Sequence, residues 1–127
     1  MNTIETNDYK SYLTDDTFIL TANKILIRCG IRIDLKGYHY LADAIILYGT
    51  GLCKRFSDIY RIIAADRGIK PKSVMREISY AINAAHGIHE RISSMLGIEI
   101  PKTVVHNGLV IAYLGTIFRD PDASLFA

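Results

Sequence analysis

The sequence predicts an all-α fold of about six helices that contains a helix-turn-helix. Apolar residues recur at helical spacing through most of the 127 residues, and glycines stand where these segments end. Residues 59–82, "IYRIIAADRGIKPKSVMREISYAI", show helix, glycine-containing turn and helix in succession. A chain of this length is one domain and buries enough surface to fold without a metal or a disulfide.

The first elements follow from polarity and from helix signals. Residues 1–14 are polar and predict an N-terminal tail or a loosely docked segment. Residues 15–30 predict a helix that starts at two aspartates and ends at Gly30. The connector at residues 30–37 alternates branched residues with polar ones, so a short extended piece is an alternative there.

The middle of the chain predicts three helices. The second helix covers residues 38–49 and stops at the sequence "GTG". The third covers about 52–67 and ends at Gly68, and the fourth runs from Pro71 to about residue 85.

The last elements are shorter or less regular. A fifth helix is expected over residues 89–96, and residues 98–105 are either a loop or a stray strand. A last helix is expected over residues 107–118, with Asn107 as its cap. The domain therefore spans residues 15–119, between the N-terminal tail and a C-terminal tail at residues 120–127.

Each small or rigid residue of the helix-turn-helix has a physical reason. Ala64 lets a second helix cross close to the first, and Gly68 can adopt the left-handed conformation that ends a helix. Pro71 suits a first helical turn, and Lys70 before it is biased away from helix. Arg67 departs from the general pattern, because a buried apolar residue is usual at that point.

The fourth helix separates into an apolar stripe and a polar face. The stripe contains Val74, Ile78, Ala81, Ile82 and Ala85. Arg76 falls nearly opposite it, flanked by Lys72, Ser79 and Asn83 on one side and by Ser73 and Tyr80 on the other, with Met75 at the edge. Such a face suits a DNA groove, because lysine can meet phosphate and arginine can fork onto guanine. The alternative is the solvated side of a small bundle.

Charge is distributed unevenly along the chain. The net charge is only +2, so a nucleic-acid interpretation must depend on where the charge lies. Residues 54–91 hold eight basic against four acidic residues, whereas residues 1–22 hold one basic against four acidic residues. The positive excess thus lies on the third and fourth predicted helices.

Other patterns restrict the class of protein. Cys29 and Cys53 lie in apolar surroundings and predict buried free thiols, although spacing alone leaves a disulfide open. No apolar run approaches the length of a membrane span, and the N-terminus lacks a secretory pattern, so a cytoplasmic protein is expected. No catalytic nucleophile–base set appears, and His86 and His89 lack further ligands, so neither an enzyme nor a metal or cofactor site is expected.

The match to a known family is wider than the helix-turn-helix. Residues 30–45, "GIRIDLKGYHYLADAI", resemble the C-terminal effector domain of the sporulation initiation regulator, stage zero sporulation protein A. The resemblance extends over about residues 18–118, and Lys36, Gly37 and Tyr38 are its most specific part. Further matching positions are Tyr40, Leu41, Ala44, Ile45, Ile59, Tyr60, Ile63, Ala64, Pro71, Val74, Arg76, Ile78, Ala81 and Ile82.

The resemblance implies a six-helix DNA-binding effector domain of the response-regulator kind, winged-helix-like in general class. It also implies promoter boxes in double-stranded DNA, a homodimer or tandem copies on that DNA, and contact with RNA polymerase. Two features depart from the family. No receiver precedes the domain in this sequence, so phosphorylation control is not expected, and the family's arginine-rich recognition positions hold Ser73, Met75, Ser79 and Tyr80.

The sequence therefore predicts a DNA-binding transcription regulator whose fourth helix enters the major groove. The residues expected to read or hold DNA are Lys72, Ser73, Met75, Arg76, Ser79 and Tyr80. The residues expected to contact phosphates are Lys54, Arg55 and Lys70. The alternative is a protein–protein interaction module that has lost operator binding, motivated by the small number of arginines on that helix.

Overall fold

The computed structural model describes residues 6–102 and 106–121, and within them the fold is all-helical. The helices are α1 (Thr6–Leu13), α2 (Asp16–Arg28), α3 (Lys36–Gly49), α4 (Phe56–Arg67), α5 (Pro71–Ala84), α6 (Ile88–Leu96) and α7 (Asn107–Arg119). The all-α prediction is confirmed, and the described residues hold seven helices instead of about six. The additional one is α1, which packs against α3 in the range where a polar tail was expected.

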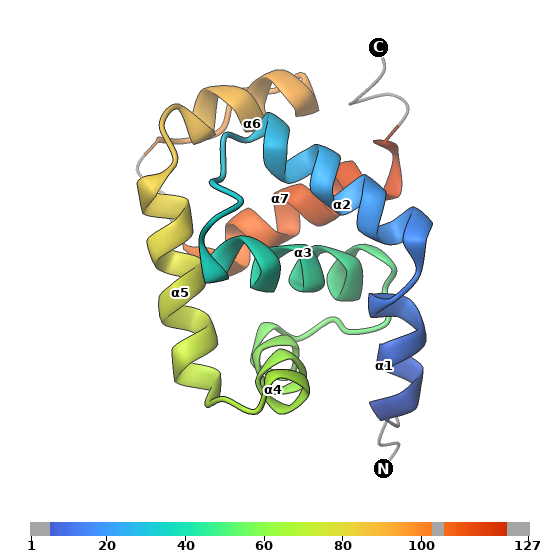
Figure 1. The fold of residues 1–127 in the computed structure, drawn as a ribbon. Helices are drawn as coiled ribbons and strands as arrows, with labels where there is room; N and C mark the ends of the chain where they lie inside the picture. Colours follow the sequence, from blue (N-terminus) through green and yellow to red (C-terminus); the bar gives the residue numbers. More distant parts are fainter. Residues whose placement is uncertain (1–5, 103–105, 122–127) are drawn as a thin grey trace.

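Helix α3 is the centre of the fold. It packs against α1, α2, α4, α5 and α7, and Figure 1 shows these helices around it. Ten of its 14 residues are buried, because it is apolar on nearly every side. The core therefore consists of one central helix whose neighbours each bury a single apolar stripe against it.

Two glycines let the helices approach α3 closely. A Cβ at Gly37 would lie 2.0 Å from the backbone oxygen of Glu77, so the first turn of α3 touches the backbone of α5. At the other end of α3, a Cβ at Gly49 would lie 2.6 Å from the Phe118 ring of α7. The glycine of the Lys-Gly-Tyr sequence is thus the point at which α5 is fixed to the core.

Several boundaries and contacts differ from the sequence predictions. Helix α4 begins at Phe56 instead of residue 52, because the chain turns at Gly51, which has a positive φ. The connector between α2 and α3 forms no strand: Ile31 is buried while Ile33 is exposed. Residues 98–102 are also without strand, and residues 103–105, part of the same prediction, lie outside the described residues.

Asn107 does not cap the last helix. His106 occupies the cap position of α7 without a side-chain hydrogen bond, and Asn107 is the first helical residue. The Asn107 amide nitrogen instead donates to the backbone oxygen of Met75 at 2.9 Å. The prediction failed because Asn107 finds its partner on α5, a contact that local sequence does not reveal.

None of the helices in the described part of the chain combines the length and the apolar character needed to cross a membrane.

Both cysteines are free and buried, as predicted. We expect Ellman's reagent to label both thiols of the native protein very slowly, at a rate about a thousandfold or more below that of the unfolded chain. Burial raises the pKa of Cys29 to about 12, so raising the pH to 10 should not expose a thiolate there. Rapid labelling of one thiol per chain under native conditions would contradict this prediction.

Candidate nucleic-acid interface

Helices α4 and α5 form the predicted helix-turn-helix. Gly68 ends α4 with φ 68°, and the Ile69 N–H donates to the Ala64 oxygen at 3.0 Å, which closes the helix end. Lys70 is extended, and Pro71 opens α5. The turn therefore has the conformation that its glycine and proline demand.

Helix α5 buries the predicted stripe as far as Ile82 and exposes the opposite face, whereas Ala85, the last predicted member of the stripe, is half-buried and follows the end of the helix. Val74, Ile78, Ala81 and Ile82 are buried against the core. Lys72, Met75, Arg76 and Tyr80 are exposed, whereas Ser73 and Ser79 are half-buried at the two edges of this face. Figure 1 shows α5 at the margin of the molecule, with α3 and α4 on its inner side.

The first turn of α5 is suited to an anion. It contains no acidic residue, and no side chain caps its N–H groups. The positive end of the helix dipole makes such an end attractive to phosphate. Lys70 and Lys72 are exposed beside it, and Lys54 and Arg55 are exposed just before α4. All three predicted phosphate contacts are thus accessible at the helix-turn-helix.

Acidic groups near the face are few. Glu77 of α5 is half-buried, and Asp34 of the connector is bound to Arg32 by two hydrogen bonds of 2.7 and 3.1 Å. The guanidinium holds the pKa of the Asp34 carboxyl below its ordinary value. The exposed face thus keeps its positive character.

Arg67, which stands where a buried apolar residue is usual, anchors the end of α4 to α3. Its Nη2 atom donates to the Asp43 carboxylate at 2.9 Å, and its guanidinium lies 5.5 Å from the centre of the Tyr40 ring. Asp43 is only 7% exposed and is the one buried charged residue in the described chain. The arginine therefore replaces an apolar contact with an ion pair at the helix-turn-helix.

We expect Arg67→Met to destabilise the fold by about 2 kcal/mol, because it leaves the Asp43 carboxylate without its cation. Burial already raises the pKa of Asp43 above 3.8, with Arg67 opposing the shift, so the variant should raise it further. Because the pKa of the Asp43 carboxyl is higher in the folded than in the unfolded chain, the loss of stability is complete at pH values above the folded pKa. It is relieved as the pH falls toward the ordinary carboxyl pKa, since the carboxyl is then protonated in both states. Urea unfolding at pH 7 and near pH 4 measures this. The double variant with Asp43→Asn should regain most of the loss, and an equal loss at both pH values would contradict the assignment.

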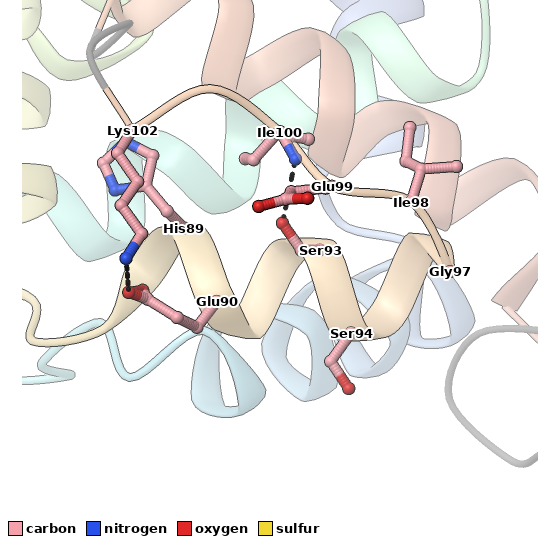
Figure 2. Close-up of a pocket in the computed structure, with 9 residues that line it drawn as sticks. All are labelled: His89, Glu90, Ser93, Ser94, Gly97, Ile98, Glu99, Ile100 and Lys102. Carbon is pink, nitrogen blue, oxygen red and sulfur yellow. Dashed lines mark hydrogen bonds and ion pairs between the residues drawn. The ribbon is translucent and has the colours of Figure 1, made fainter.

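A hollow of about 470 Å³ lies between α6 and residues 97–102. Figure 2 shows Lys102 reaching Glu90, at 3.3 Å, and Ser93 beside the backbone of Ile100. The Ser93 oxygen accepts from the Ile100 N–H, so these groups are already satisfied and fasten the segment to α6. His89 lines this hollow while His86 is exposed elsewhere.

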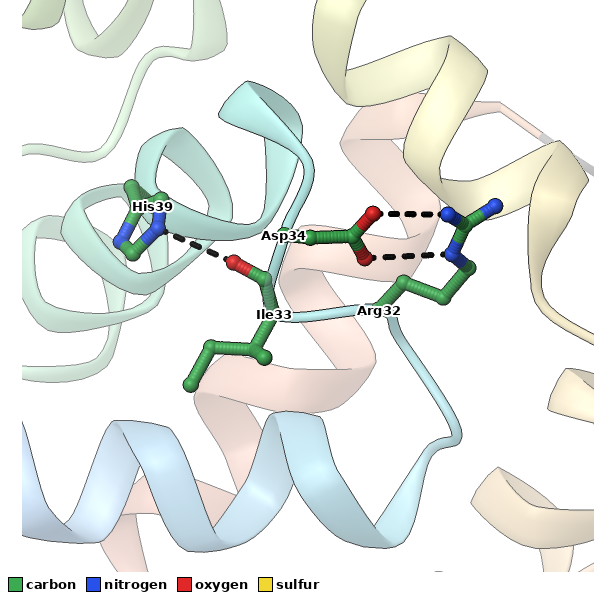
Figure 3. Close-up of polar contacts among 4 residues, drawn as sticks. All are labelled: Arg32, Ile33, Asp34 and His39. Atoms are coloured by element: carbon green, nitrogen blue, oxygen red, sulfur yellow. Dashed lines mark hydrogen bonds and ion pairs between the residues drawn. The ribbon is translucent and has the colours of Figure 1, made fainter.

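Arg32 is a neighbour of the predicted interface that was not among the predicted residues. Arg32 lies in the connector before α3, close to Gly37, where α3 packs against the backbone of α5. Figure 3 shows its guanidinium pointing toward the neighbouring helix while Asp34 binds it. An arginine in an irregular connector carries no periodic signal, so only the packing of α3 on α5 reveals its position.

In a comparison with known families, the model described as the sporulation initiation factor Spo0A C terminal matches residues 22–116. The matched range contains all of α3, α4, α5 and α6. Comparisons with curated proteins and with solved structures gave no match.

Proposed function

Because this chain belongs to the family of the sporulation initiation factor Spo0A C terminal, a family of DNA-binding effector domains, we propose that it binds specific DNA sequences to regulate transcription. In this proposal α5 enters the major groove of double-stranded DNA, and α4 lies across the backbone. The observation that carries the proposal is the orientation of α5. Its apolar stripe is buried, Lys72, Arg76 and Tyr80 are exposed, and the helix itself lies at the margin of the molecule (Figure 1).

The residues of the face have different roles in this proposal. Arg76, near the middle of the exposed face, forks onto a base edge, for which guanine offers two acceptors. Met75 and Tyr80 supply apolar contacts, and the half-buried Ser73 and Ser79 add short hydrogen bonds at the edges. Lys54, Arg55, Lys70 and Lys72 hold phosphates, which positions the helix without selecting a sequence.

Selection of bound sequences from a random duplex pool tests the proposal. We expect enrichment of a short common box, and binding that weakens steeply as salt is added, because phosphate contacts release counterions. Boxes in tandem would indicate that copies bind side by side. A pool that stays random after repeated rounds, with binding still present, would leave only non-specific DNA affinity and would overturn the sequence-specific part.

A second candidate function is a protein-interaction module. It is favoured by Met75 and Tyr80, which are 43% and 57% exposed on the same face that carries Arg76. Large apolar side chains of this kind are typical of protein interfaces. A gel shift on random duplex at low salt separates the two functions, because phosphate contacts are strongest there. Absence of any shift would favour the interaction module, and a salt-sensitive shift would favour DNA binding.

A further inference from the structure

Three arginines gather around Gly30, away from the turn between α4 and α5. Arg28 ends α2, Arg32 lies in the connector, and Arg91 comes from α6; all three are exposed. The Arg91 Nη1 atom donates to the Arg28 oxygen at 3.3 Å. A Cβ at Gly30 would lie 3.3 Å from the Arg91 Nε atom, so the bare glycine leaves room for that guanidinium. We call Arg28, Arg32 and Arg91 the arginine patch.

The arginine patch continues onto the proposed DNA-reading helix. Arg32 lies in the connector that leads into Gly37, the residue at which α3 packs against Glu77 and Ala81 of α5. The connector that carries Arg32 is held in place because Ile31 is buried and His39 Nε2 hydrogen-bonds the Ile33 oxygen at 3.1 Å. Figure 3 shows this arrangement, with Arg32 directed toward the neighbouring helix. The arginine is therefore presented from a fixed backbone beside α5.

The patch retains a positive excess after its acidic neighbours are counted. Asp34 offsets Arg32 through their two hydrogen bonds. Glu90, the residue before Arg91, is paired with Lys102 at 3.3 Å. Arg28 and Arg91 have no carboxylate partner among the ion pairs of the described residues.

The length of α5 and the width of the major groove indicate which part of the DNA the arginine patch would contact. A helix of 14 residues such as α5 is about 21 Å long, whereas the major groove is about 12 Å wide. A helix lying across the groove therefore approaches both phosphate backbones. Lys70 and Lys72 lie at the N-terminal end of α5. The contact with Gly37, beside the connector that carries Arg32, is made by Glu77 and Ala81 in the other half of the helix.

We propose that the arginine patch is a second phosphate-binding surface, which holds the DNA backbone beside the C-terminal half of α5. The proposal rests on the DNA-binding function proposed above. It assigns part of the affinity to residues outside the helix-turn-helix, on a chain whose reading helix has Arg76 as its one arginine. Asp34 acts against that affinity, because it occupies Arg32 and repels phosphate.

Salt titrations of duplex binding test the arginine patch. Arg28→Gln and Arg91→Gln should each flatten the plot of log affinity against log salt by roughly 0.9, the value for one phosphate contact. Arg32→Gln should flatten it less, because Asp34 already offsets that charge. The matching lysine variants should restore the slope, because phosphate binding needs the charge. Asp34→Asn should tighten binding several-fold. Lys10→Gln on α1, which lies on another side of the fold, should change nothing.

The outcomes separate this proposal from the proposed function. Glutamine variants with unchanged slopes, in a protein that still binds DNA and responds to Arg76→Ala, would overturn the arginine patch and leave the function standing. A wild-type protein that fails to bind any duplex at low salt would overturn both. Circular dichroism of each variant shows whether it is folded, and Arg28 and Arg32 give an independent answer if Arg91→Gln loses structure.

Discussion

Replacing Gly37 with alanine is expected to cost about 3 kcal/mol of unfolding free energy, at the upper end of what overpacking does in protein cores. The new Cβ would stand 2.0 Å from the Glu77 oxygen and 2.7 Å from the Ala81 Cβ, far inside contact distance. The nearest atom belongs to backbone, so no side-chain rotation relieves the clash. Helix α5 would have to move away from α3.

Gly108→Ala provides the matched control. It also adds one methyl group to a glycine in a helix, but the nearest atom is in the Phe56 ring, at 2.9 Å. A ring at the end of a side chain can shift, and alanine favours helix over glycine by about 1 kcal/mol. We therefore expect a change near zero for Gly108→Ala and a large loss for Gly37→Ala in parallel denaturant titrations. Equal effects would show that the α3–α5 contact is softer than the structure indicates.

The same contact couples stability to function. Because α5 is the proposed reading helix, a shift of its position in Gly37→Ala should weaken specific DNA binding more than non-specific binding. The measurement is the ratio of affinities for a selected box and for random duplex, taken where the variant remains folded. An unchanged ratio would mean that α5 keeps its place.

Sequence patterns predicted what is encoded locally. The helix-turn-helix followed from Gly68, Pro71 and the spacing of the apolar stripe, since each acts on its own turn. Those patterns could not reveal that Gly37 meets the backbone of α5, that Arg67 binds Asp43, or that Asn107 binds the Met75 oxygen. These partners lie 40, 24 and 32 residues apart, so only the packing of the helices brings them together.

In the candidate interface, too, some residues follow from local sequence patterns and others depend on the packing of the helices. The orientation of Arg76 followed from helical periodicity and agrees with the burial of α5. Arg32 was not predicted to lie near the interface, because an irregular connector has no period from which the direction of a side chain can be inferred. Helix α1 was missed because its sequence is polar and short, and its position depends on the contact with α3.

Arg76→Ala is expected to lower affinity for the selected box by about 1–3 kcal/mol, or roughly 5- to 150-fold, while random duplex binding changes little. The physical reason is that a forked arginine contributes only where a guanine edge stands opposite it. Lys72→Ala is the matched comparison on the same face. It should weaken all sequences alike and flatten the salt dependence by roughly 0.9, as expected for one phosphate contact.

The contrast between the two variants decides how α5 is used. Arg76 and Lys72 are both exposed on α5, so a merely structural effect should be small for either. If Arg76→Ala reduced affinity for boxed and random duplex by the same factor, Arg76 would be a phosphate contact, and sequence reading would have to come from Met75 and Tyr80. If Arg76→Ala instead broadened the sequences recovered from a random pool at one base position, that position would be the guanine it reads.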